Sequence, residues 1–136
     1  MNERAQNRLR FSLAHEIGHF ILHSDIFKTI GYASVDEWMN FFQKIPDDQY
    51  TWIEQHAYEF AGRLLVPLDK LKDKLNDAIA MAENAGFDSW DSSGDSTRGF
   101  ISHAISRFFG VSQQVIEKRL MRENLWPPER RSGDIV

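Results

Sequence analysis

The feature that most constrains this chain is a pair of histidines, His15 and His19, one helical turn apart with Glu16 beside them. On an α-helix, side chains four residues apart point the same way, so both imidazoles can reach one ion. Imidazole nitrogen suits zinc, and a catalytic zinc site needs only three protein ligands. The His-Glu-x-x-His pattern therefore predicts a helix that supplies two metal ligands. Glu16 is not expected to be a ligand, because it lies where it could take a proton from a water that attacks a carbonyl.

The residues around this motif are spaced as in an amphipathic helix. Small and apolar residues recur at helical intervals and predict a buried face. They are Ala14, Ile17, Gly18, Ile21 and Leu22. His15 and His19 lie roughly opposite Ile17, so we expect the helix to bury its Ile17 side and to offer its histidines to a metal. A purely structural role for the two histidines is the alternative interpretation.

This helix is predicted to run from about Leu9 to His23, after a charged lead-in over residues 1–8. Ser24 and the residue after it indicate the turn that ends it. His23 continues the histidine face but lies about 12 Å along the axis from His15. That distance is too long for a single ion to bind both residues. We therefore interpret His23 as a residue that hydrogen-bonds to a ligand, or as a histidine that the helix dipole favours near the end of the helix.

A second helix is predicted over residues 52–66, where apolar residues again follow a helical stripe. Glu54 falls at the edge of that stripe, and a carboxylate beside a core face is costly unless something such as a metal compensates it. Ala57 and Ala61 are small enough to let this helix approach the first one closely. Two histidines from one helix and Glu54 from a later one are the ligand set of many zinc peptidases. A capping or surface role for Glu54 is the alternative.

Composition and charge exclude several other classes of protein. With 136 residues, 42% hydrophobic and 26% charged, the chain suits one folded domain and is not wholly disordered. A net charge of -4 gives no general attraction to nucleic acid or anionic lipid. The absence of cysteine excludes disulfides and cysteine-ligated zinc, and it fits a cytoplasmic protein. No signal sequence or membrane span is predicted, because the apolar stretch near the start is interrupted by the metal motif.

The remaining elements are also predicted to be helical. Ser34 or Asp36 could cap a short helix before Pro46, and Pro67 can begin a longer helix that ends near Gly86. Residues 87–99 are rich in Ser, Asp and Gly, and we expect them to form a mobile loop. The fold class is therefore mainly α with little or no β-sheet, built on a zincin-like core in which the histidine helix packs on the glutamate helix.

Residues 101–126 are typical of a helix-turn-helix, with Gly110 in the turn and Ser112 capping the second helix. In a DNA complex the second helix would present a mixed polar set without basic bias. That set is Gln113, Gln114, Glu117 and Lys118. We therefore favour a structural or partner-docking pair, and nucleic acid is not an expected partner. One domain is predicted over residues 1–126, followed by a flexible tail over 127–136.

Two stretches carry a more specific pattern. They are Arg10-Phe-Ser-Leu-Ala-His-Glu-Ile-Gly-His19 and the later Glu54-x-x-Ala-x-x-Phe-Ala-x-x-Leu-Leu-Val-Pro67. Together they resemble the ImmA/IrrE family of metallo-endopeptidases, bacterial and phage proteins often encoded beside a helix-turn-helix repressor that they cleave or inactivate. The resemblance covers residues 9 to about 126. It implies zinc on His15, His19 and Glu54, with Glu16 as general base and a protein such as a repressor as substrate.

The chain departs from that family in two places. Tyr58 stands where the family usually has asparagine, and we expect it to pack rather than to bond a ligand or an oxyanion. The family usually carries a strand-containing segment before the metal helix, and zinc peptidases commonly add an extended substrate to a sheet edge. Residues 1–8 offer little material for such an edge. A fragment of a longer protein, an edge borrowed from a partner, or poor proteolysis would each account for this.

The sequence thus predicts a zinc-dependent metallo-endopeptidase that hydrolyses peptide bonds of a partner regulatory protein, either repressor-like or antitoxin-like. The alternative, from another class, is a DNA- or protein-binding regulatory module that retains the helical frame without activity.

Overall fold

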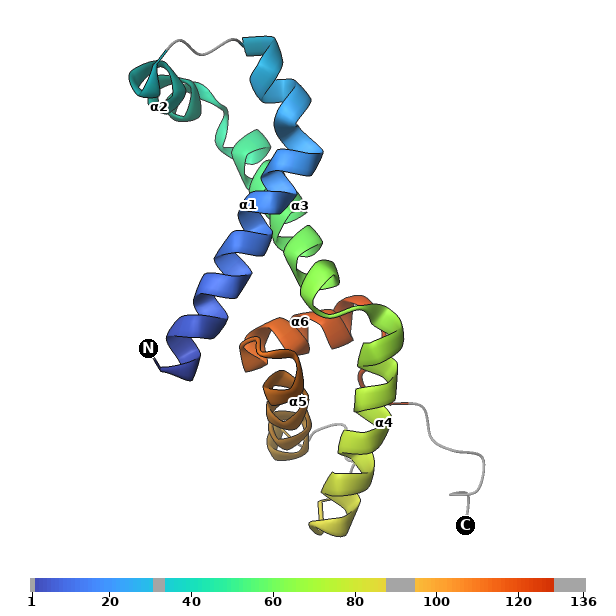
Figure 1. Ribbon diagram of the computed structural model, residues 1–136. Coiled ribbons are helices and arrows are strands. Elements are labelled where there is room, and N and C mark those ends of the chain that lie inside the picture. Colours follow the sequence, from blue (N-terminus) through green and yellow to red (C-terminus); the bar gives the residue numbers. More distant parts are fainter. Residues whose placement is uncertain (1, 31–33, 88–94, 129–136) are drawn as a thin grey trace.

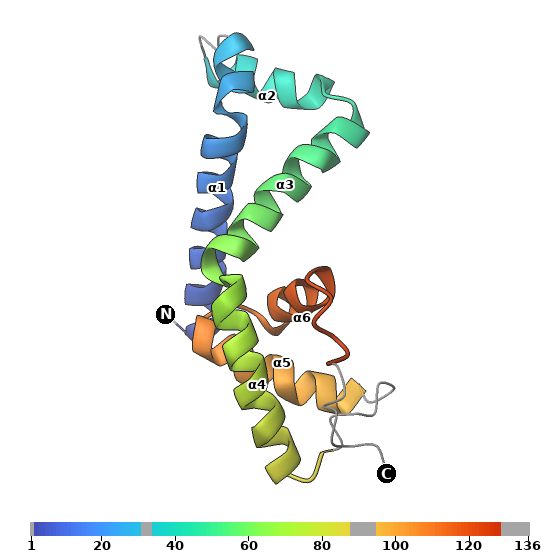
Figure 2. The same ribbon diagram turned by 90° about the vertical axis from the view of Figure 1, so that its right-hand side faces the viewer.

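The computed structural model describes residues 2–30, 34–87 and 95–128, which form six helices and no strand. The helices are α1 (Glu3–Ile30), α2 (Val35–Lys44), α3 (Asp47–Leu65), α4 (Leu68–Asn84), α5 (Asp95–Phe109) and α6 (Gln113–Arg122). Helices α1 and α3 cross, and α4, α5 and α6 gather beyond the end of α3 (Figure 1). Figure 2 shows α1 and α3 diverging toward the end that α2 spans. The mainly α fold is confirmed, and the histidine helix packs on the glutamate helix as predicted.

Helix α1 extends beyond both of its predicted ends. The Oδ1 atom of Asn2 accepts a hydrogen bond from the backbone N–H of Ala5 at 2.9 Å, so residues 3–8 are helical rather than a lead-in. At the other end, Ser24 and Asp25 do not stop the helix, which continues to Ile30. Each of these two residues costs a helix less than about 1 kcal/mol relative to alanine, and this cost is too small to end a long helix.

The predicted capping residues lie where the sequence indicates. The Oγ atom of Ser34 accepts a hydrogen bond from the backbone N–H of Glu37 at 3.2 Å and begins α2. The Oγ atom of Ser112 accepts one from the N–H of Val115 at 3.3 Å and begins α6. Gly110 has a φ of 64°, a conformation that glycine adopts without strain, and it makes the turn between α5 and α6. The helix-turn-helix geometry of this region is therefore present.

The predicted loop over residues 87–99 is partly wrong. Residues 95–99 form the first turn of α5, because Asp, Ser and Thr are as suited to the start of a helix as to a loop. Residues 88–94 lie outside the described part of the chain, as do residues 129–136 of the predicted tail. No helix in the described ranges combines the length and the apolar character needed to cross a membrane.

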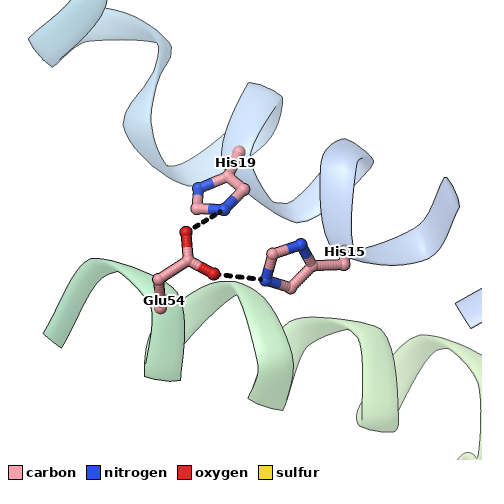
Figure 3. Close-up of side chains that lie close together, drawn as sticks. All are labelled: His15, His19 and Glu54. Carbon is pink, nitrogen blue, oxygen red and sulfur yellow. Dashed lines mark ion pairs between the residues drawn. The ribbon is translucent and has the colours of Figure 1, made fainter. Parts of the chain in front are cut away.

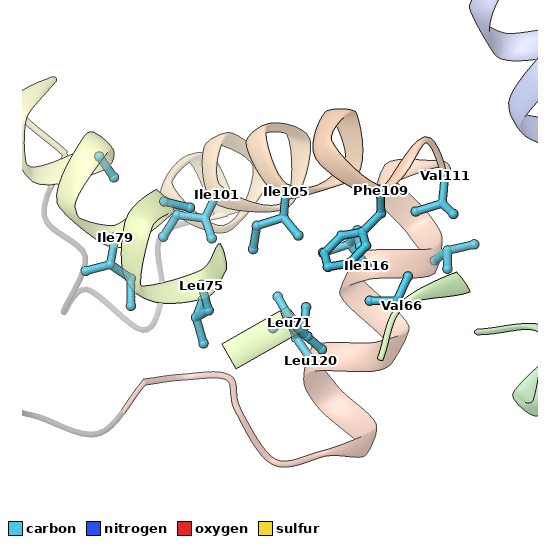
Figure 4. Close-up of a cluster of buried hydrophobic side chains, with 13 residues drawn as sticks. Val66, Leu71, Leu75, Ile79, Ile101, Ile105, Phe109, Val111, Ile116 and Leu120 are labelled. Carbon is cyan, nitrogen blue, oxygen red and sulfur yellow. The ribbon is translucent and has the colours of Figure 1, made fainter. Parts of the chain in front are cut away.

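The hydrophobic core lies among α4, α5 and α6, beginning at Val66 (Figure 4). Its buried members are Val66, Leu71, Leu75, Ala78, Ile79, Ala82, Ile101, Ile105, Phe109, Val111, Val115, Ile116 and Leu120. The buried guanidinium of Arg119 in α6 donates two hydrogen bonds to the backbone oxygen of Val66, from Nη2 at 3.0 Å and from Nε at 3.3 Å. It also pairs with Glu123, and this bond lowers the pKa of the Glu123 carboxyl below its ordinary value. Helix α6 is thus fixed to the junction between α3 and α4.

Helices α1 and α3 meet through small residues. Ala14 and Gly18 of α1 and Ala57 and Ala61 of α3 are all buried. A Cβ atom placed on Gly18 would lie 3.1 Å from the backbone oxygen of Ala57 and 3.0 Å from the ring of Phe60. Both distances are shorter than an ordinary carbon contact of about 3.5 Å or more. The two helices therefore touch almost backbone to backbone at this point.

The predicted buried face of α1 is confirmed at Ala14 and Gly18 and is wrong at its large apolar residues. Ile17, Leu22 and Leu13 are exposed, and Ile21 and Phe20 expose 57% and 74% of their surface. Helix α3 packs instead on the side of α1 that carries the small residues and the histidines, and no described element buries the apolar side. An apolar stripe thus indicates that a helix face can be buried. The face that is actually covered depends on how the partner helix packs.

We predict that Gly18→Val lowers the free energy of unfolding by about 1–3 kcal/mol, because the new side chain must push α1 away from α3. Gly99→Val is the matched control, since a Cβ on Gly99 meets only the side chain of Gln113, at 3.7 Å. Urea unfolding of both variants measures the difference. Equal losses in the two variants would show that helix propensity, and not the close contact, sets the cost.

Candidate metal centre

The residues predicted to bind metal lie together where α1 and α3 cross (Figure 3). The Nε2 atom of His15 is 3.0 Å from one carboxylate oxygen of Glu54, and the Nε2 atom of His19 is 3.1 Å from the other. All three side chains are partly buried. Among the described residues they form the one group of three potential ligands whose donor atoms all lie within 4.8 Å of one another. The spacing on α1 and the position of Glu54 on α3 bring them together because Gly18 and Ala57 let the two helices approach closely.

This donor set fits a zinc ion. Ligands about 2.0–2.2 Å from a tetrahedral zinc lie roughly 3.3 Å from one another. The two observed separations of 3.0 and 3.1 Å are close to that value, so only small side-chain movements would admit the ion. Two imidazoles and one carboxylate also leave a fourth position open, as catalytic zinc sites require. Their assignment as ligands stays a prediction that the geometry supports.

Glu16 neighbours His15 but does not belong to the group of three candidate ligands. Its side chain is 75% exposed, and its Oε1 atom is 3.6 Å from Nδ1 of His15, which is the ring nitrogen on the far side from Glu54. At that distance the contact is not a hydrogen bond. The carboxylate therefore lies in solvent, on the side of the His15 ring away from the three candidate ligand atoms. Its role as a general base stays a prediction.

A cleft of about 660 Å³ opens next to the ligands, between α3 and α6, with His15 and Glu54 in its wall. Two contacts join these helices across it. The Lys118 ammonium lies 4.6 Å from the centre of the Tyr58 ring, and Arg122 pairs with Glu59. Tyr58 also packs against Phe11 of α1, with ring centres 4.9 Å apart, which agrees with the packing role expected for it. Sequence reasoning did not predict this cleft, because it depends on how α6 is placed against α3.

His23 is the most buried of the histidines near the site, at 1% exposed. Its Nδ1 atom is 3.1 Å from Nδ1 of His19, and its Nε2 atom is buried without a hydrogen-bond partner in the described structure. Burial lowers the pKa of His23, and the neighbouring His19 and His56 lower it further, while Glu54 raises it. The neutral imidazole is therefore favoured. His56 stacks parallel to His23 at 6.2 Å, so it packs beside the site and is not in the ligand group.

A helix bearing His-Glu-x-x-His, packed against a helix that supplies a glutamate, is the arrangement of a zinc-peptidase class of site. In comparison with known families, the chain matches the IrrE N-terminal-like domain of the M78 peptidases over residues 2–121. The chain belongs to this metallopeptidase family, and the resemblance found in its two motifs is confirmed. Comparisons with curated proteins and with solved structures found no match.

We predict that the purified protein binds about one zinc ion and that Glu54→Gln weakens this binding more than about 100-fold. Loss of a residue that only hydrogen-bonds to a ligand usually costs about 10–100-fold in metal affinity, and loss of a ligand should cost more. His15→Ala should have a similar effect. Glu59→Gln is the matched control on the same helix, and Glu16→Gln should also retain the metal. Zinc titration in competition with a chelating dye measures all four. Unchanged affinity in Glu54→Gln would remove Glu54 from the ligand set.

Proposed function

We propose that this protein is a zinc-dependent metallo-endopeptidase that cleaves a partner regulatory protein of repressor or antitoxin type. One observation carries the proposal. Two imidazole nitrogens and a carboxylate converge beside a cleft in a chain that belongs to the M78 peptidase family. The substrate is inferred from the family that the two motifs resemble. Proteins of that family are often encoded beside a repressor.

In this proposal His15 and His19 hold the ion through their Nε2 atoms, and Glu54 holds it through its carboxylate. A bound zinc ion lowers the pKa of water and polarises the scissile carbonyl. Glu16 accepts the proton of the attacking water on its carboxylate and returns it to the nitrogen of the leaving amine. In the structure this carboxylate is exposed beside Nδ1 of His15, so in this proposal the side chain turns toward the ion to serve both transfers.

The cleft between α3 and α6 is the binding surface proposed for the substrate chain. Its volume of about 660 Å³ lies within the range of about 300–1,000 Å³ typical of ligand sites and can hold a few residues of an extended peptide. The walls combine apolar and charged residues, including Tyr58, Lys118 and Met121. A peptide bound there would present a backbone carbonyl to the side of α3 that carries Glu54.

The structure offers less support for the alternative DNA-binding module. On α6, Oε1 of Glu117 accepts hydrogen bonds from Oγ of Ser102 and from Nε2 of Gln113, both at 3.2 Å. Two of the residues that a recognition helix would present are thus engaged with each other and with α5. The helix-turn-helix pair then serves mainly to close the hydrophobic core and to form one wall of the cleft.

Incubation of the zinc-loaded protein with a helix-turn-helix repressor encoded next to it tests the proposal. We expect cleavage that stops on chelation and that falls about 10²–10⁴-fold in Glu16→Gln, the range typical of a lost general base. The variant keeps all three ligands and so serves as a matched control for metal binding. Absence of cleavage, together with DNA binding that survives chelation, would favour the regulatory-module alternative.

A further inference from the structure

We propose that His23 is a positioning residue for His19. In this proposal Nδ1–H of His19 donates a hydrogen bond to Nδ1 of His23, and this bond directs the Nε2 lone pair of His19 toward the ion. The inference rests on the proposed metal centre and adds to it a residue that binds no metal itself. His23 lies one helical turn beyond His19 on the same face of α1, so the helix itself sets their separation.

The position of the proton on His19 decides whether this residue can bind an ion. The Nε2 atom of His19 faces Glu54, on the side where the ligand atoms converge. A neutral imidazole carries one proton, and a nitrogen that binds a cation must offer its lone pair. The proton of a metal-binding His19 must therefore be on Nδ1.

A hydrogen-bond partner for that proton lies on His23. The Nδ1 atom of His19 lies 3.1 Å from Nδ1 of His23, which is hydrogen-bonding distance. Of two facing nitrogens, one must donate and the other accept. With the His19 proton on Nδ1, His23 accepts, and its own proton lies on Nε2. Metal-binding histidines generally donate their second N–H to a fixed acceptor, and here the acceptor is an imidazole.

One ring nitrogen of His23 has no hydrogen-bond partner among the described residues. Nε2 of His23 is buried with no hydrogen-bond partner in the described structure, and a buried N–H without an acceptor is costly. The opposite tautomer pair would leave an unpaired acceptor there instead, but it would put the His19 proton on Nε2, where it blocks the ion. The arrangement that permits metal binding thus carries a local cost at His23. A leucine at this position would avoid that cost, so packing alone does not explain a histidine.

Neighbouring side chains restrict the movement of His23. Its ring stacks parallel to that of His56 at 6.2 Å, and His56 packs on Trp52 at 3.9 Å. These α3 side chains lie beside His23, which is 1% exposed and so has little room to turn. His15 has no comparable partner, because its Nδ1 faces the exposed Glu16 at 3.6 Å. His19 is therefore the ligand whose orientation is set before an ion arrives.

Three variants test the proposal with zinc as the probe. His23→Leu removes the acceptor and fills the space, whereas His23→Asn keeps an oxygen near the position of Nδ1. His103→Leu is the control, since it makes the same kind of substitution at an exposed position of α5 outside the metal centre. We expect zinc affinity to fall about 10–100-fold in His23→Leu, and to stay within about threefold of the wild type in the other two. Urea unfolding of the metal-free proteins reports any separate loss of stability.

Equal zinc affinity in His23→Leu and wild type would overturn the proposal, as would equal losses in His23→Leu and His23→Asn. Should His23→Leu not fold, nitrogen-15 spectra of the zinc-loaded wild type decide instead. A His23 proton on Nε2 supports the proposal, and one on Nδ1 overturns it. Failure of the wild type to bind zinc would overturn the metal centre itself, an outcome distinct from one confined to His23 variants.

Discussion

The contact between Gly18 and the backbone of α3 is the constraint on which the candidate site depends. A carboxylate on a short glutamate side chain can reach two imidazoles on another helix only if the two helices lie unusually close. The absence of a side chain at Gly18 and the small residue Ala57 allow that approach. The site is therefore determined by residues that never touch the ion, and these residues belong to the same two motifs as the ligands.

The body of helices α4, α5 and α6 holds this crossing in place. Two side chains make the connection at opposite ends. Arg10 of α1 donates hydrogen bonds to the backbone oxygens of Phe109 and Gly110, at 2.8 and 2.7 Å, and Arg119 of α6 binds the backbone oxygen of Val66 at the end of α3. Charged groups that donate to these carbonyls satisfy backbone atoms at helix ends, which are otherwise without partners inside the helix. The same anchoring of α6 creates the cleft beside the ligands, so stability and access to the site have a common origin.

The sequence predicts the local features of this protein better than it predicts which helix faces pack together. The metal motif, the caps Ser34 and Ser112, and the turn at Gly110 each follow from short-range chemistry, and the structure contains them. The buried face of α1 was predicted only in part. Ile17 and Ile21 follow the same helical spacing as Ala14 and Gly18, but α3 packs on the small residues and the histidines and leaves the isoleucines exposed. The cleft depends on how α6 packs against α3, and no pattern in the sequence predicts that packing. The contact of His23 with His19 could have been predicted from the four-residue spacing, but only the structure shows that His23 is buried.

Burial changes steeply along one face of α1, and this gradient divides the site into two parts. Glu16 is 75% exposed, and His23, two turns further, is 1% exposed. Proton exchange with a substrate needs a mobile carboxylate in contact with water, whereas a ligand needs a fixed ring and a fixed tautomer. Helix α3 supplies this difference, because its Trp52 and His56 cover the far end of the face and leave the near end open. A single helix can thus carry an exposed carboxylate and a buried imidazole on one face, provided that its partner helix crosses it at an angle rather than lying along it.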